Sequence, residues 1–134
     1  MHAITTEQEA SLVRAALDVR SNAYAPFSEF RVGAAVLDDL GRVHAGTNVE
    51  NSSFGLTICA ERVAATRAIS DGAKAIVAVA VATSPLANPC GACRQFLYEF
   101  GPQMRVLIID SDSGEVERRT VLAELLPGGF RLTN

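Results

Sequence analysis

A continuous apolar run from Ala75 to Val81 constrains the fold of this chain more than any other feature. These residues are all small or β-branched and leave no polar face, a pattern typical of a strand that is covered on both sides. A second run of this kind, from Arg105 to Asp110, predicts another buried strand. Strands of this type need helices on both faces of their sheet, which indicates an α/β architecture.

Helical periodicity and turn residues around these strands predict one domain over residues 1–134. The expected helices cover residues 6–22, 57–71, 90–100 and 121–126, and the other expected strands cover 30–37, 42–47 and 115–120. Thr6-x-x-Glu9 matches a capping box for the first helix, and Thr57 can cap the second. The sequence therefore predicts a three-layer α-β-α sandwich with a mixed five-stranded sheet.

Composition excludes several classes of protein. The net charge is −3 with a single lysine, so the chain offers no basic patch for nucleic acid. No apolar run approaches the roughly 20 residues that span a bilayer, and the N-terminus lacks the pattern of a secretory signal. Three cysteines in 134 residues do not form a disulfide framework. We therefore expect a cytoplasmic protein without a membrane or nucleic-acid partner.

All three cysteines fall at the openings of two expected helices: Cys59 in one, and Cys90 and Cys93 of a C-x-x-C pair in the other. A helix N-terminus stabilises the thiolate, which is the form that binds metal. Three facing thiolates predict a zinc site. A structural site would take a fourth ligand, His2 or His44, whereas a catalytic site keeps one position open for water. A redox dithiol is the other interpretation of C-x-x-C.

Charged neighbours of the cysteines favour the open, catalytic site. Glu61 can bend over the first turn of its helix toward the metal, where a carboxylate can carry protons to and from water. Arg62 shares the helix face of Cys59 and would offset the negative charge of three thiolates. Arg94 is a second candidate for that supporting role.

These residues resemble the three-cysteine signature of the zinc nucleoside deaminases. Further segments resemble the small homotetrameric cytidine deaminases, in the expected order along nearly the whole chain: Tyr24-Ala25-Pro26-Phe27-Ser28, Asn48-Val49-Glu50-Asn51, Cys59-Ala60-Glu61-Arg62, Pro89-Cys90-Gly91-Ala92-Cys93-Arg94-Gln95 and Leu125-Leu126-Pro127.

The resemblance implies hydrolytic deamination of cytidine and 2′-deoxycytidine to the uridine products and ammonia, in pyrimidine salvage. It implies one Zn²⁺ per subunit and a homotetramer with shared sites. The roles it implies are zinc binding by Cys59, Cys90 and Cys93; proton transfer by Glu61; contact with the pyrimidine carbonyl by the backbone of Ala60; ligand packing by Phe30; binding of the ribose 3′-hydroxyl by Asn48 and Glu50; and stacking in a neighbouring subunit's site by Phe130.

Two positions depart from the family pattern, because Phe27 and Phe54 stand where the family commonly has tyrosine. The missing hydroxyls leave open a related aminohydrolase that acts on a modified cytosine nucleoside such as blasticidin S. A non-enzymatic, zinc-stabilised binding module is the remaining alternative, and it requires His44 or His2 to close the metal site.

Overall fold

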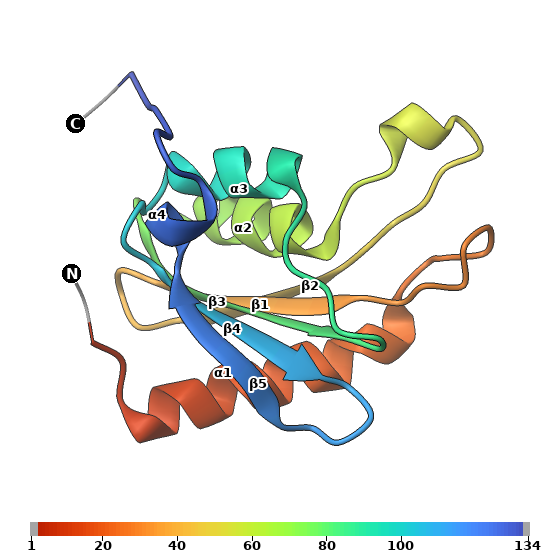
Figure 1. Ribbon diagram of the computed structural model, residues 1–134, viewed down its shortest axis with the longest axis horizontal. Coiled ribbons are helices and arrows are strands. Elements are labelled where there is room, and N and C mark those ends of the chain that lie inside the picture. Colours follow the sequence, from red (N-terminus) through yellow and green to blue (C-terminus); the bar gives the residue numbers. More distant parts are fainter. Residues whose placement is uncertain (1–2, 133–134) are drawn as a thin grey trace.

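The computed structural model describes residues 3–132 and shows a sheet between two helical layers (Figure 1). The helices are α1 (Thr6–Val19), α2 (Ala60–Ser70), α3 (Gly91–Tyr98) and α4 (Leu122–Leu125), with short 3-10 turns at Arg20–Asn22 and Phe54–Leu56. The strands are β1 (Gly33–Asp38), β2 (Val43–Thr47), β3 (Ile76–Thr83), β4 (Arg105–Asp110) and β5 (Val116–Val121). The predicted architecture is confirmed.

The five strands lie in the order β2-β1-β3-β4-β5. Only the β3–β4 pair among the described strands is parallel, and the helix α3 connects its two members. The other three neighbouring pairs are antiparallel, including the predicted β1–β2 hairpin. The sheet is therefore mixed, as the alternation of hairpin and helical segments predicted.

Two cores lie on opposite faces of this sheet. On one face, Leu12 and Ala16 of α1 are fully buried against Ala35 and Ala80. On the other face, α2, α3 and α4 cover β1, β3 and β4 through a larger cluster that includes Leu97. Because β1, β3 and β4 are covered on both sides, their sequences are apolar without a polar alternation.

Three local predictions were wrong in detail. The capping box begins at Thr5, whose hydroxyl accepts the N–H of Gln8 at 3.0 Å while the Gln8 side chain accepts the N–H of Thr5 at 2.9 Å. The N-cap position of the second long helix is Cys59, not Thr57, and the Cys59 side chain makes no capping hydrogen bond. The first strand begins at Gly33, not at residue 30.

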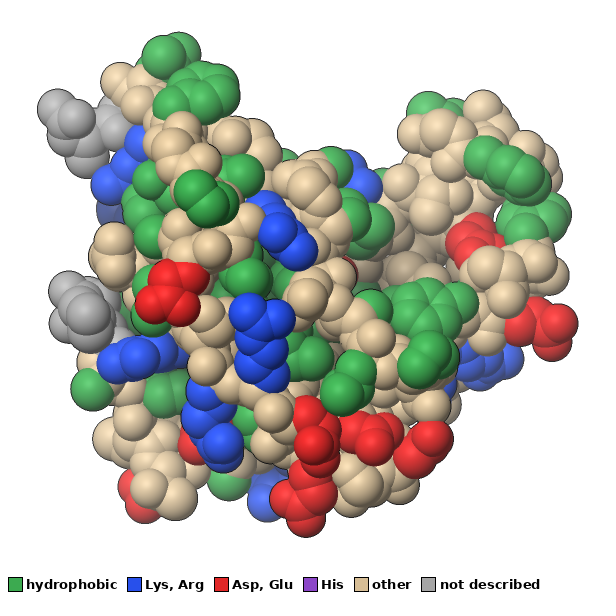
Figure 2. All heavy atoms as spheres, viewed as in Figure 1, with side chains coloured by type: hydrophobic (Ala, Val, Ile, Leu, Met, Phe, Trp, Pro, Cys, Tyr) green, Lys and Arg blue, Asp and Glu red, His purple; other side chains and the backbone are tan. Residues whose placement is uncertain are grey.

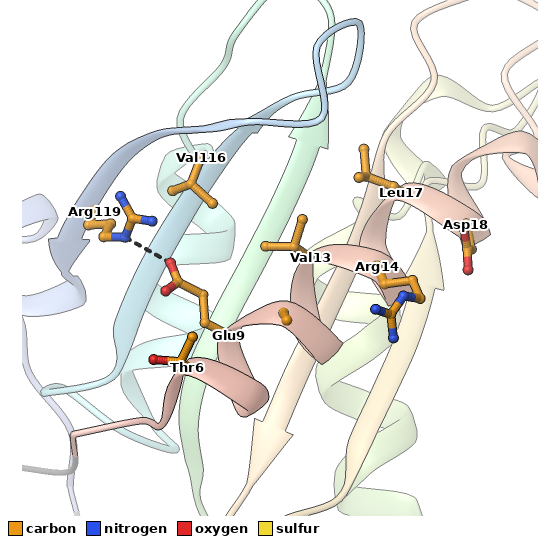
Figure 3. A pocket seen from close by; sticks show the side chains of 9 residues that line it. Thr6, Glu9, Val13, Arg14, Leu17, Asp18, Val116 and Arg119 are labelled. Carbon is orange, nitrogen blue, oxygen red and sulfur yellow. Dashed lines mark hydrogen bonds and ion pairs between the residues drawn. The ribbon is translucent and has the colours of Figure 1, made fainter.

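A shallow groove separates α1 from the edge strand β5 (Figure 3). Its floor is apolar, with Val13, Leu17 and Val116, and the ion pair between Glu9 and Arg119 closes one side at 2.8 Å. None of the site residues predicted from the sequence lines this groove. Within residues 3–132, no helix combines the length and apolar character that a membrane crossing requires.

Candidate active site

The chain path brings the openings of α2 and α3 to the same end of the molecule. Along the chain, β3 connects α2 to α3 and runs in the opposite direction to both. The helices α2 and α3 therefore lie side by side and run in the same direction over one face of the sheet (Figure 1). Cys59 is the N-cap of α2, Cys90 is the N-cap of α3, and Cys93 lies in the first turn of α3. The three Sγ atoms all lie within 4.8 Å of one another.

The spacing of these sulfurs fits a zinc ion. The Sγ atoms of Cys59 and Cys90 are 3.8 Å apart. Thiolates at about 2.3 Å from a tetrahedral zinc are separated by about 3.8 Å, whereas a disulfide needs about 2.0 Å. All three cysteines are free thiols. The cluster therefore has the spacing of a metal site, and it offers three ligands.

The structure does not bring His44 to the cysteines. His44 is buried on β2, with Nε2 2.9 Å from Asp38 Oδ2 and Nδ1 3.4 Å from Asp71 Oδ2. Burial alone would raise the pKa of Asp38, but hydrogen bonds from His44, Arg42 and the backbone outweigh it and lower the pKa from 3.8 to about 2. His44 thus belongs to a structural cluster, and the closed zinc site through His44 is wrong. His2 lies outside the described residues.

Charge around the cysteines stabilises one thiolate. A hydrogen bond from Cys93 outweighs the effect of burial and, with contributions from Arg62 and Cys90, lowers the pKa of the Cys59 thiol to about 5. The pKa of Cys93 is raised because its thiol donates to Cys59 and is buried. Arg62 Nη2 lies 3.7 Å from Cys59 Sγ, which supports its predicted role.

Arg94 does not contact the sulfurs. Its guanidinium donates to the carbonyls of Pro89 at 2.7 Å and Leu125 at 2.8 Å. It therefore fastens the opening of α3 to α4, and the prediction that it balances the thiolates finds no contact to support it.

Glu61 lies in the first turn of α2 beside the cluster and is 5% exposed. Burial raises the pKa of its carboxyl to about 7, and the negative charge of Cys59 acts in the same direction. A carboxyl with a pKa near neutrality can both take and give a proton. This arrangement can perform acid–base chemistry next to a metal.

A pocket opens over Glu61 and two of the cysteines. Its lining residues come from the loop before β1, the end of β2, the opening of α2, the end of β3 and the loop before α3: Phe30, Val32, Asn48, Thr57, Cys59, Ala60, Glu61, Val81, Thr83, Ala87, Asn88 and Cys90. Half of these were predicted from the sequence. Thr83 was not, although its place at the carboxyl end of a buried strand was a usable signal. Its hydroxyl is buried without a protein partner.

Asn48 and Glu50 both hold the loop that precedes β1. The Asn48 amide accepts from Val32 N at 2.9 Å and donates to Phe30 O at 2.8 Å. The Glu50 carboxylate accepts from the backbone N–H groups of Phe27 and Ser28 at 2.9 and 3.2 Å. Asn48 lines the pocket, whereas Glu50 is not among the lining residues.

Phe130 does not reach this pocket within the described chain. Its ring is 64% exposed, and its carbonyl accepts from Gln95 Nε2 at 3.1 Å. Phe27 and Phe54 contact each other with ring centroids 5.6 Å apart, also outside the pocket lining. The loop between β2 and α2 carries exposed hydrophobic side chains at its tip, on the upper right of Figure 2.

Comparisons with known proteins agree with this geometry. Residues 6–109 match the model of the cytidine and deoxycytidylate deaminase zinc-binding region. The chain is 45% identical to the cytidine deaminase of Halalkalibacterium halodurans over 121 residues, covering 89% of this chain and 91% of that protein. The crystal structure of cytidine deaminase from Burkholderia pseudomallei is similar, with a TM-score of 0.84, 41% identity and coverage of 95% of this chain and all of that one.

Proposed function

The chain belongs to the cytidine and deoxycytidylate deaminase family, and we propose that it hydrolyses cytidine and 2′-deoxycytidine to uridine and 2′-deoxyuridine. It is an enzyme that deaminates cytidine, as the names of relatives 42–45% identical to it indicate, and its dependence on zinc follows from the zinc-binding region that it matches and from its three clustered cysteines. The observation that carries the proposed mechanism is the buried carboxyl of Glu61 in the pocket wall beside three clustered thiols.

Five residues of the site have a defined task in the chemistry of this proposal. Cys59, Cys90 and Cys93 hold the zinc, which when bound supplies the Lewis acidity that activates water near neutral pH. Glu61 takes a proton from the water that attacks C4 and delivers it to ring N3. Glu61 then carries the second proton to the departing amine, so that water and cytidine give uridine and ammonia. The backbone N–H of Ala60 donates to the pyrimidine carbonyl.

Hydrogen-bond capacity supports a sugar hydroxyl as the ligand of Asn48 and Glu50. Oε1 of Glu50 already accepts two N–H groups, and Oε2 accepts the hydroxyl of Ser28, which leaves one acceptor site on Oε2. The amide of Asn48 uses one hydrogen for Phe30 O and keeps the other. One acceptor and one donor complement a single hydroxyl group, and we assign it to the ribose 3′ position.

A homotetramer with shared sites accounts for the exposed aromatic and aliphatic side chains. Those on the loops beside the pocket are Tyr24, Phe27, Val49, Phe54, Leu56 and Ile58. We propose that subunit contacts cover them and that Phe130 stacks in a neighbouring subunit's site. Light scattering that gives a monomer mass with full activity would refute this assembly. Three free thiols suit a reducing compartment, and we propose a cytoplasmic location on that ground.

Conversion of cytidine to uridine, followed by ultraviolet absorbance, tests the function directly. We expect the Glu61→Gln variant to lose about 10²- to 10⁴-fold in kcat while retaining zinc. Glu7→Gln, in the first turn of α1 and away from the pocket, is the matched control and should behave as wild type. Near-normal turnover by zinc-loaded Glu61→Gln would refute the mechanism. No conversion by the zinc-loaded wild-type protein would refute the assigned substrate.

A further inference from the structure

The hydroxyl of Ser28 connects Glu50 to Phe30, a residue of the pocket wall that is distant from Glu50 in the sequence. It donates its single hydrogen to Glu50 Oε2, and it accepts the backbone N–H of Phe30 at 3.0 Å. We infer that Ser28 is a positioning residue: it fixes the Glu50 carboxylate and the Phe30 wall relative to each other, so that the sugar of the nucleoside meets a preformed site.

The direction of these two bonds leaves Ser28 no alternative. The N–H of Phe30 can only donate, so it occupies a lone pair of the Ser28 oxygen. The hydroxyl hydrogen must then point to the carboxylate of Glu50, because an ionised carboxylate accepts hydrogen bonds and cannot donate one. Ser28 therefore occupies one lone pair of Glu50 Oε2 and fixes the orientation of the carboxylate. The other lone pair of Oε2 then points in a defined direction.

The backbone beside Ser28 shows that this loop is held in place. Glu29 has a φ of 59°, in the left-handed region that costs a residue with a Cβ about 1–2 kcal/mol. Such a conformation persists only where the surroundings determine it. Here the Glu50 carboxylate accepts the backbone N–H groups of Phe27 and Ser28. The Asn48 side chain forms hydrogen bonds with the backbone of Phe30 and Val32.

Removal of the Ser28 hydroxyl should therefore weaken binding of the sugar without changing the chemistry at the base. The inference rests on the proposed function, because it assigns the free acceptor of Glu50 to the ribose 3′-hydroxyl. A loss confined to sugar binding appears in KM. A loss of general loop structure would appear equally with any nucleoside.

The test compares cytidine with 3′-deoxycytidine in wild-type and Ser28→Ala protein. We expect KM for cytidine to rise about tenfold or more, the range of a hydrogen bond to a charged group, while kcat stays within about twofold. With 3′-deoxycytidine, the two proteins should have the same kcat/KM. Ser28→Thr keeps the hydroxyl and should restore KM for cytidine.

Ser113→Ala is the matched control. Ser113 also accepts the N–H two residues ahead of it, from Glu115 at 3.1 Å, but in the turn between β4 and β5. It should leave both substrates unaffected. If Ser28→Ala does not fold, Ser28→Cys keeps a weaker donor in the same place. Its kcat/KM values for cytidine and 3′-deoxycytidine are then compared with those of the wild type in the same way.

Equal losses with cytidine and 3′-deoxycytidine, or unchanged kinetics, would overturn the role of Ser28 while leaving the deaminase function intact. Absence of turnover in the wild-type protein would instead refute the proposed function, so the two failures are distinguishable.

Discussion

β2 packs tightly against the metal-binding helix α2 at Gly46. A Cβ at this position would lie 2.5 Å from Ala64 N and 2.9 Å from Val63 Cγ1, where ordinary contact begins at 3.4 Å. The backbone atom cannot rotate away, so Gly46→Ala would force α2 from the sheet by about 0.9 Å. The substitution adds only a methyl group, but it acts on the helix that carries Cys59 and Glu61.

The expected effects follow from that displacement. Insertion of a methyl group into a packed interface costs about 1–3 kcal/mol of unfolding free energy. Zinc ligands tolerate about 0.2 Å of error in their distances, and the three ligands are divided between α2, which starts after Cys59, and α3, which starts after Cys90 and contains Cys93. We therefore expect Gly46→Ala to weaken zinc binding about 10- to 100-fold, as when the support of a metal ligand is removed.

Urea unfolding of the metal-free protein and competition with a chromogenic zinc chelator measure the two effects separately. Gly55→Ala is the control, because a Cβ there meets nothing within 4 Å and the φ of Gly55 is ordinary. Gly55→Ala should leave the free energy of unfolding and the zinc affinity equal to those of the wild type within error. Wild-type stability and zinc affinity in Gly46→Ala would refute the argument that this contact sets the position of α2.

Three further predictions each concern a single side chain: Arg62, Asp38 or Thr83. Arg62→Gln should weaken zinc binding about 10- to 100-fold in chelator competition, because it removes the cation 3.7 Å from Cys59 Sγ; unchanged affinity would contradict that role. Asp38 has a folded-state pKa of about 2, below its usual 3.8, so its contribution to stability is full above pH 3.8 and is lost as the pH falls through about 2. In urea unfolding of metal-free protein, Asp38→Asn should be less stable than wild type at pH 5, and the difference should shrink toward pH 2; a constant difference would contradict it. Thr83→Val should raise the free energy of unfolding by about 1 kcal/mol, because it removes a buried hydroxyl with no protein partner; a loss of stability in the same assay would contradict it.

Most of the fold was predictable because the strong signals are local. The strand β4 has its predicted bounds, Arg105–Asp110, and Gly72 ends α2 with a φ of 101° where a stop was expected. The errors arose where two local patterns compete. Thr5 with Gln8 and Thr6 with Glu9 both satisfy the capping pattern, and the pattern alone does not decide which of the two threonines is the N-cap.

The metal site was predictable for a similar reason. Each cysteine lies at a helix opening that can be recognised locally, and the α2-β3-α3 connection brings the two openings together. The partners of a polar side chain were not predictable. His44 pairs with Asp38 of the same hairpin and with the distant Asp71 instead of the thiols, and no local pattern distinguishes those partners from zinc.

The start of β1 shows why sequence periodicity could not describe the side of the pocket that residues 30–32 form. Residues 30–32 have the composition of a strand, but the side chain of Asn48 bonds to Phe30 O and Val32 N and takes the place of a neighbouring strand. The chain there lines the pocket, and the strand β1 begins only at Gly33. Asn48, which we propose to bind the sugar, also replaces a strand contact, so its side chain is held by the fold itself. The loop of the pocket therefore needs no ligand to become ordered, and little conformational entropy remains to be lost on binding.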